Sequence, residues 1–233
     1  MIPSDLERQH HFTYPTLYQQ LAEDGLLSGE TPGASRPALG RHVELLPLTQ
    51  ASELTAALAD PKDYRYVRSD YQFIVFGQDN SGNYYCFLAG GQVAGELPVV
   101  ILWGALAEAT FLARNLQDFI FRSMLLDLSG YETGGTVSFG DFRQTLVAAL
   151  ETYGRYLTEK QHAMLHDLLR RAPVSWQEHT TTYRDAPDSA RGFDIADTTR
   201  NWRGFLTRKE AATILADTIA FDKLDTSLPV KRR

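Results

Sequence analysis

The clearest pattern of apolar and polar positions lies in the middle of the chain. Two runs rich in aromatic and β-branched residues, 71–76 (YQFIVF) and 84–88 (YYCFL), flank the turn-forming segment 77–83 (GQDNSGN). This arrangement predicts a β-hairpin. The apolar run 97–103 (LPVVILW) predicts a third strand that is buried on both faces, and residues 110–113 predict a fourth.

Helices are expected on both sides of these strands. Residues 15–24 place apolar side chains on one face, with Pro15 in the first turn and Gly25 as the stop. Residues 43–46 are a short apolar strand candidate, and a helix capped by Thr49 is expected to follow to about residue 58. A further helix begins at Asn115, whose side chain is expected to cap its first turn.

The pattern becomes helical after Gly130. Three polar pairs have the spacing of a capping box or of its Asp variant, and they predict helices over about 139–156, 159–171 and 208–224. The pairs are Ser138 with Asp141, Thr158 with Gln161, and Thr207 with Glu210. The segment 173–205 is polar and aperiodic, which predicts a long loop. We therefore expect an α+β domain over 1–130 and a helical extension over 131–233.

Composition fits a globular protein, because 43% of the 233 residues are hydrophobic and 11% are aromatic. The single Cys86 excludes an intramolecular disulfide framework and a cysteine-based zinc cluster. The N-terminal residues lack the pattern of a secretory leader. The longest apolar run, 99–107, is far shorter than the roughly 18 residues that a membrane span needs. We expect a cytoplasmic protein with no membrane segment.

Charge is distributed unevenly along the chain. Residues 1–130 carry 8 Lys and Arg against 15 Asp and Glu, a net of −7, whereas 131–233 carry 15 against 14, a net of +1. The overall charge of −6 argues against direct, nonspecific binding of nucleic acid. An acidic first half could attract a basic protein partner, although acidic charge also simply keeps proteins in solution.

Candidate catalytic and metal-binding residues are sparse. His162 and His166 share a helix face, but their segment HAMLH lacks the glutamate of the zinc-protease motif, and exposed histidines are the simpler interpretation. Cys86 lies among aromatic residues in a predicted strand, as a core residue would. The glycines form no phosphate-binding loop, and no nucleophile elbow is present. We therefore expect no catalytic residues, no cofactor and no metal.

The hairpin resembles a known family. The run FGQDNSGNYYCFL (76–88) is similar to the D-x-x-G-x-Y signature of the SUKH superfamily, which includes bacterial immunity proteins and a fungal regulator of cell-wall synthesis. Three further segments, within 12–128, resemble family motifs in the family's order: FTYPTLYQQLAEDGLL, LPVVILW and FLARNLQDFI. The residues that match are Pro15, Tyr18, Asp79, Gly82, Tyr84, Pro98, Val99, Asn115 and Phe119.

This resemblance implies an α+β fold, a central and mostly antiparallel sheet flanked by helices. It also implies a binding function, in which an immunity protein neutralises a cognate secreted toxin, often a nuclease, by covering its active or substrate-binding face. The acidic first half would suit a basic toxin. The candidate contact residues are acidic or aromatic positions: Asp60, Asp63, Tyr64, Tyr66, Asp70, Tyr71, Asp79, Glu96 and Glu108.

Two other functions stay open at this point. A regulatory scaffold that binds a cellular partner would use the helical extension and the segment 173–205. A hydrolase would use His162 and His166 with nearby carboxylates, and would hold a metal ion. For Asp79 and Gly82 the alternative role is to build the hairpin turn.

Overall fold

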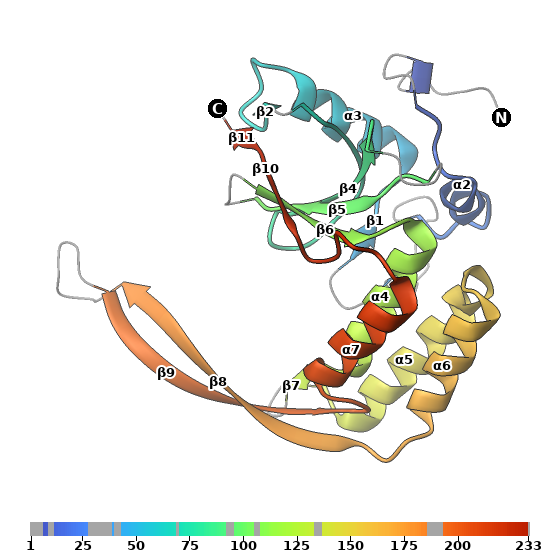
Figure 1. The fold of residues 1–233 in the computed structure, drawn as a ribbon, viewed down its shortest axis with the longest axis vertical. Coiled ribbons are helices and arrows are strands. Elements are labelled where there is room, and N and C mark those ends of the chain that lie inside the picture. Colours follow the sequence, from blue (N-terminus) through green and yellow to red (C-terminus); the bar gives the residue numbers. More distant parts are fainter. Residues whose placement is uncertain are drawn as a thin grey trace.

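A six-stranded antiparallel sheet, in the order β1-β3-β4-β5-β6-β10, forms the centre of the structure (Figure 1). The computed structural model describes residues 7–8, 12–27, 39, 43–68, 70–91, 96–104, 108–132, 137–185 and 193–232. The strands of the sheet are β1 (Glu44–Leu45), β3 (Gln72–Gln78), β4 (Tyr84–Ala89), β5 (Val99–Leu102), β6 (Glu108–Ala113) and β10 (Ser227–Pro229). The predicted hairpin is confirmed, because β3 pairs with β4 from Gln72↔Ala89 to Gln78↔Tyr84.

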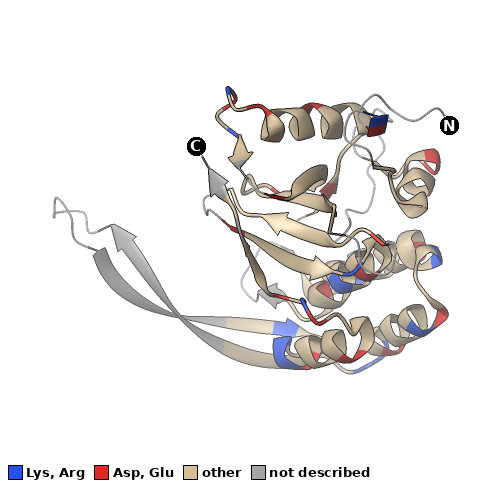
Figure 2. Cartoon of the chain, turned by 45° about the horizontal axis from the view of Figure 1, so that its top comes forward, with Lys and Arg blue, Asp and Glu red and all other residues tan. Residues whose placement is uncertain are grey.

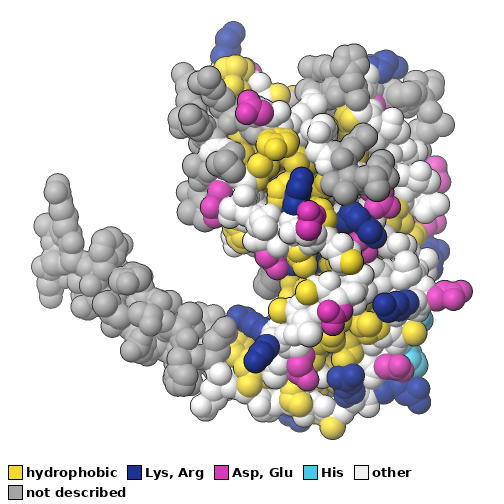
Figure 3. Space-filling view, viewed as in Figure 1, with side chains coloured by type: hydrophobic (Ala, Val, Ile, Leu, Met, Phe, Trp, Pro, Cys, Tyr) yellow, Lys and Arg dark blue, Asp and Glu magenta, His cyan; other side chains and the backbone are white. Residues whose placement is uncertain are grey.

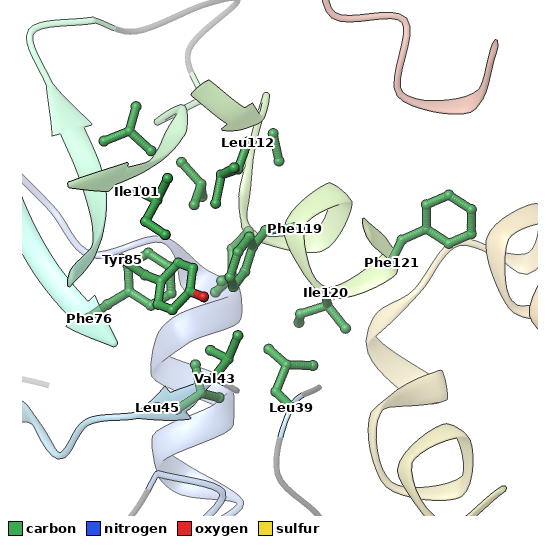
Figure 4. Packing of buried hydrophobic residues seen from close by; sticks show 14 of the residues in the cluster. Leu39, Val43, Leu45, Phe76, Tyr85, Ile101, Leu112, Phe119, Ile120 and Phe121 are labelled. Atoms are coloured by element: carbon green, nitrogen blue, oxygen red, sulfur yellow. The ribbon is translucent and has the colours of Figure 1, made fainter. Parts of the chain in front are cut away.

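Helices cover both faces of the sheet. Helix α3 (Leu48–Ala59) lies on one face, and α2 (Thr16–Glu23) and α4 (Leu116–Leu128) lie on the other (Figure 1). Figure 4 shows Phe119 of α4 directed toward Tyr85 and Phe76 of the sheet. Ring centroids lie 5.3 Å apart for Phe119 and Tyr85 and 5.6 Å for Phe119 and Phe76. These contacts bury the apolar face of α4 and hold the helix against the sheet.

The N-terminal helices begin and end as local chemistry requires. Helix α2 ends in a Schellman motif, since the Leu26 N–H bonds to Leu21 O and the Gly25 N–H to Ala22 O, with Gly25 at φ 65°. The prediction of a Thr49 cap is wrong, because α3 starts at Leu48 and Pro47 occupies the N-cap position. Proline there fixes φ near the helical value without any side-chain hydrogen bond.

The helices after Gly130 pack on α4, as a helical extension (Figure 1). They are α5 (Phe139–Tyr153), the short 3₁₀ turn η1 (Gly154–Tyr156), α6 (Glu159–Leu169) and α7 (Arg208–Ile219). Four predicted caps are confirmed: Asn115, Ser138, Thr158 and Thr207 each accept a backbone N–H three residues on. The pairs Thr158–Gln161 and Thr207–Glu210 form full capping boxes.

The chain returns to the first sheet at its C-terminal end. Strand β10 pairs with β6, and β11 (Lys231–Arg232) pairs with β2 (Val67–Arg68). Leu228 of β10 is buried in the same core as the sheet. The division of the chain into two domains at residue 130 stays a prediction. The structure adds that β10, from the C-terminal end of the chain, is an edge strand of the sheet formed by residues 44–113.

The prediction of a loop over 173–205 is wrong. Strands β8 (Val174–Asp185) and β9 (Phe193–Gly204) form a long hairpin, and β7 (Tyr131–Glu132) pairs with the base of β9. The hairpin leaves the body of the molecule as an arm (Figure 1). The hydrophobic pattern carried no signal for these strands, because 173–205 shows no regular alternation of apolar and polar residues.

Candidate partner-binding surfaces

The segment between α3 and β3 contains most of the candidate contact residues. We call it the α3–β3 loop, residues 60–71. Tyr64 is the most exposed large apolar side chain described, at 85%, and its ring lies 5.2 Å from the Arg65 guanidinium carbon. Tyr66 and Tyr71 instead line a cavity of about 220 Å³ beside Leu58 at the end of α3. Tyr64 is therefore the aromatic side chain of this loop that is most available to a partner.

The α3–β3 loop has balanced charge. Asp60, Asp63 and Asp70 are offset by Lys62, Arg65 and Arg68, and Figure 2 shows acidic and basic positions close together at the end of α3. Asp63 Oδ1 accepts the Arg65 backbone and Nε hydrogens at 2.9 Å, and Oδ2 accepts Nη2 at 2.8 Å. The Arg65 hydrogen bonds lower the pKa of Asp63 to about 2. This carboxylate is engaged within the loop and folds it into a turn.

The D-x-x-G-x-Y signature forms a rigid corner between two strand connections. Asp79 Oδ1 accepts the backbone N–H groups of Ser81 and Asn83, while Asp79 Oδ2 accepts Asn83 Nδ2 at 2.7 Å. Asn83 Oδ1 in turn accepts the Gly104 N–H at 2.8 Å. Gly82 has φ 78°, a value that favours glycine. We call this set the signature corner: Asp79, Gly82, Asn83 and Gly104.

The remaining signature residue, Tyr84, begins β4 and is half-buried against the core. Tyr84 pairs with Gln78 of β3 at the end of the hairpin that the signature turn closes. Glu108 is also at this end, because its carbonyl accepts the Trp103 N–H at 3.3 Å across the β5–β6 connection. Asp79 therefore has the turn-building role, and Tyr84 and Glu108 lie near it.

Glu96 lies apart from this corner, at the start of α4. Its Oε2 accepts Asn115 Nδ2 at 2.6 Å and lies 3.3 Å from Arg114 Nε. Asn115 Oδ1 accepts the Asp118 N–H at 2.8 Å, and Asp118 Oδ1 accepts Gln161 Nε2 of α6 at 2.9 Å. Burial raises the pKa of Asp118. Glu96 thus positions the cap of α4 in a network that joins the sheet domain to the helical extension.

The other family-motif residues support the fold from inside. Tyr18 is fully buried and donates its hydroxyl hydrogen to Leu46 O at 2.9 Å. Pro98 O accepts the Leu88 N–H at 2.9 Å, and Val99 pairs with Phe87 in the sheet. Pro15 occupies the N-cap position of α2. Together with Phe119, these residues build the sheet–helix core.

An apolar groove lies where the sheet meets α4, and we call it the α4 groove. Its volume is about 250 Å³. Tyr85, Trp103 and Leu126 line it, and Arg122 and Asp225 lie at its margin. Sequence reasoning missed this groove because its residues come from β4, β5, β6, α4, the position before β1 and the segment after α7. The apolar character of 97–103 was visible, but it indicated only burial.

The histidine pair lies on the exposed side of α6. His162 and His166 are both exposed, and His166 Nδ1 is 3.9 Å from Asp167 Oδ1 of the same helix. Among the described residues, no group of three or more His, Cys, Asp or Glu side chains is arranged to hold a metal ion. Cys86 is fully buried, and burial raises the pKa of its thiol. These positions are those expected of surface histidines and a core cysteine.

Acidic and basic side chains are mixed on the face of the molecule that Figure 3 displays. No helix in the described ranges combines the length and the apolar character that crossing a membrane requires. Because charges of both signs are mixed on this face, the acidic excess of 1–130 does not by itself identify a binding surface. The charge of each candidate surface, such as the α3–β3 loop or the α4 groove, has to be counted separately.

Comparison with known proteins identifies one family. The model of the SMI1 / KNR4 family (SUKH-1) matches residues 4–122, which is 119 of the 233 residues. The match includes the signature corner, the α3–β3 loop and most of α4. No curated protein and no solved structure gave a significant match.

Proposed function

The chain belongs to the SMI1/KNR4 family (SUKH-1), and from this premise we propose that it is an immunity protein that neutralises a cognate secreted toxin. Family membership carries the proposal. The protein acts in the cytoplasm, without catalysis, and its partner is a protein. Neutralisation is by occlusion: a preformed surface covers the active or substrate-binding face of the toxin, for which a nuclease is the leading class.

A rigid surface supports this mechanism. The side-chain bonds of Asp79 and Asn83 fix the turn between β3 and β4, and Asn83 also fixes Gly104. The ion pair of Asp63 and Arg65 fixes the α3–β3 loop. Surfaces that are ordered before binding lose less conformational entropy on association. Occlusion by such a surface needs no rearrangement of the immunity protein.

Tyr64 is the proposed aromatic anchor of the α3–β3 loop. An exposed tyrosine brings a large contact area, and truncation of a central anchor typically costs about 2 kcal/mol or more of binding free energy. Asp60, Asp63, Tyr66, Asp70 and Tyr71 surround it as the polar and aromatic rim of the proposed contact. Asp79, Glu96 and Glu108 remain candidate contacts beyond this loop.

The test uses the purified chain and the C-terminal domain of the toxin encoded beside its gene. We expect a stable complex, and Tyr64→Ala should weaken it about tenfold or more, as expected for a hot spot. Val137→Ala is the matched control, because Val137 is also exposed but lies before α5. Absence of a complex with the unsubstituted chain would overturn the proposed function.

Charge reversal tests the electrostatic part. The triple variant Asp63→Lys, Asp70→Lys and Glu108→Lys should lower the association rate at low salt if the partner is basic. The control variant Glu151→Lys, Asp167→Lys and Asp222→Lys makes the same charge change at exposed positions of residues 131–233. Equal association rates for the two variants would contradict docking on the first half.

A regulatory scaffold is the second candidate function. The β8–β9 arm, which extends from the helical layer, supports it because the arm offers a further surface for a partner (Figure 1). The two functions differ in the bound protein. Recovery of a housekeeping protein through the arm, with no affinity for the neighbouring toxin domain, would favour the scaffold.

A further inference from the structure

The α4 groove has the size and the lining of a site for one apolar side chain. Its volume of about 250 Å³ is below the range of about 300–1,000 Å³ that small-molecule sites occupy. Leu126 is 38% exposed at its margin. Trp103 donates its indole hydrogen to Thr110 Oγ1 at 2.9 Å, so the polar end of the ring is satisfied within the sheet. The groove therefore offers mainly apolar surface.

The margin of the groove is acidic. Asp127 and Asp225 are part of its lining, and Glu108 precedes Thr110 and Leu112 on the same face of β6. Burial raises the pKa of Tyr85 to about 12; the charges of Asp79 and Asp127 add to this effect, and the charge of Arg122 opposes it. One cation opposes these carboxylates among the lining residues, Arg122, and its Nη2 is paired with Asp225 Oδ1 at 2.7 Å.

The formal charges of this set can be added directly. Among the lining residues, Asp127 and Asp225 contribute −2 and Arg122 contributes +1, and Glu108 on the same face of β6 adds −1, which leaves a net charge of −2 around an apolar site. Low-dielectric walls strengthen the field of charges at the margin of a cleft. The α4 groove thus differs from the α3–β3 loop, whose acidic and basic residues balance.

We propose that the α4 groove receives an aromatic or aliphatic side chain of a protein partner that carries lysine or arginine beside it. This inference rests on the proposed function, since it specifies the partner's chemistry. The apolar lining selects the inserted side chain, and the carboxylates select its cationic neighbours. The site is ordered before binding, because Thr110 holds Trp103 and Asn83 holds the adjoining Gly104.

Two synthetic peptides of opposite charge test the proposal without a known toxin. The probes are Ac-Lys-Trp-Lys-NH2 and Ac-Glu-Trp-Glu-NH2, added to the full ¹⁵N-labelled chain and followed by amide chemical shifts. We expect the lysine peptide to shift the amides of Thr110, Arg122 and Leu126, and to bind at least tenfold more tightly than the glutamate peptide. Equal affinities, shifts confined to other residues, or no binding would overturn the proposal.

A pair of helix-surface variants locates the site. Leu126→Lys places a cation at the groove and should weaken the lysine peptide at least tenfold. Val147→Lys is the matched control, because Val147 is also 38% exposed and lies on α5, and it should leave the affinity unchanged. If the melting temperature of Leu126→Lys is well below that of the unsubstituted chain, Leu126→Gln replaces it in the peptide-binding measurement. Unchanged peptide affinity in the Leu126 variant would exclude the groove as the site.

The same variants separate this proposal from the proposed function. If the neighbouring toxin domain binds Leu126→Lys as tightly as the unsubstituted chain, the groove is not the contact, although the immunity function stands. If the lysine peptide occupies the groove and no toxin domain binds, the immunity function fails and the groove remains a site for a different basic protein.

Discussion

Asn83 connects the two strand connections of the signature corner, and its replacement by alanine is a direct test of that role. The side chain is 8% exposed. Its Nδ2 donates to Asp79 Oδ2 at 2.7 Å, and its Oδ1 accepts the Gly104 N–H at 2.8 Å. Asn83→Ala removes both bonds and leaves the Gly104 N–H and one carboxylate oxygen without these partners.

The expected loss of stability follows from the two bonds. The neutral bond to Gly104 contributes about 1 kcal/mol, and the bond to the charged Asp79 about 1.5–3 kcal/mol. We therefore expect Asn83→Ala to lower the free energy of unfolding by about 2.5–4 kcal/mol. Asn80→Ala in the same turn is the control, since Asn80 is exposed and surface changes are usually within about 0.5 kcal/mol.

Urea unfolding followed by circular dichroism measures both variants. A lower midpoint with an unchanged slope identifies a loss of stability. A double-mutant cycle with Asp79→Ala should give a coupling of about 1–2 kcal/mol, because the two side chains contact each other directly. The reasoning is refuted if Asn83→Ala is no less stable than Asn80→Ala, or if its effect simply adds to that of Asp79→Ala.

Three further predictions concern other parts of the fold. Gly104→Ala would place a Cβ 2.6 Å from Gly82 O, and we expect urea unfolding to show a loss of about 1–3 kcal/mol, as for overpacking; an unchanged midpoint would contradict this. Leu228→Ala should cost about 2–5 kcal/mol, because Leu228 is buried in β10; a value near zero would show that the last strand does not stabilise the sheet. Asp118→Asn tests pH dependence. Burial raises the folded-state pKa of Asp118, so ionisation costs stability as pH rises from the unfolded-state pKa through the folded one. Over this pH range, the melting temperature of Asp118→Asn should fall less with rising pH than that of the unsubstituted chain. Equal dependence of the two melting temperatures on pH would contradict a raised pKa of Asp118.

Local signals in the sequence predicted the elements well. The hairpin of β3 and β4 followed from aromatic strands around a turn, and the caps at Asn115, Ser138, Thr158 and Thr207 followed from side-chain spacing. Each of these features depends on residues that are close together in the sequence. Physical rules for caps and turns therefore hold at these positions, whereas at α3 a proline took the N-cap position in place of Thr49.

Features that join distant segments could not be predicted. Strand β10 pairs Ser227 with Thr110, and nothing in the three residues of β10 specifies that partner. The sequence of the β8–β9 hairpin lacks a regular apolar alternation, although its β-branched residues at 180–182 were an available signal. The α4 groove combines residues from 43 to 225. For the contact residues, the acidic excess of 1–130 did not show which segment carries it, and in the α3–β3 loop Lys62, Arg65 and Arg68 balance Asp60, Asp63 and Asp70.

Survival of cells that produce the toxin tests the central claim most directly. The chain is co-expressed with the C-terminal domain of the toxin encoded beside its gene, and colony counts are compared with and without the chain. The account predicts that the unsubstituted chain restores growth and co-purifies with the toxin domain, while Tyr64→Ala restores growth less well. Cell death that is unaffected by a well-expressed, folded chain would contradict the account.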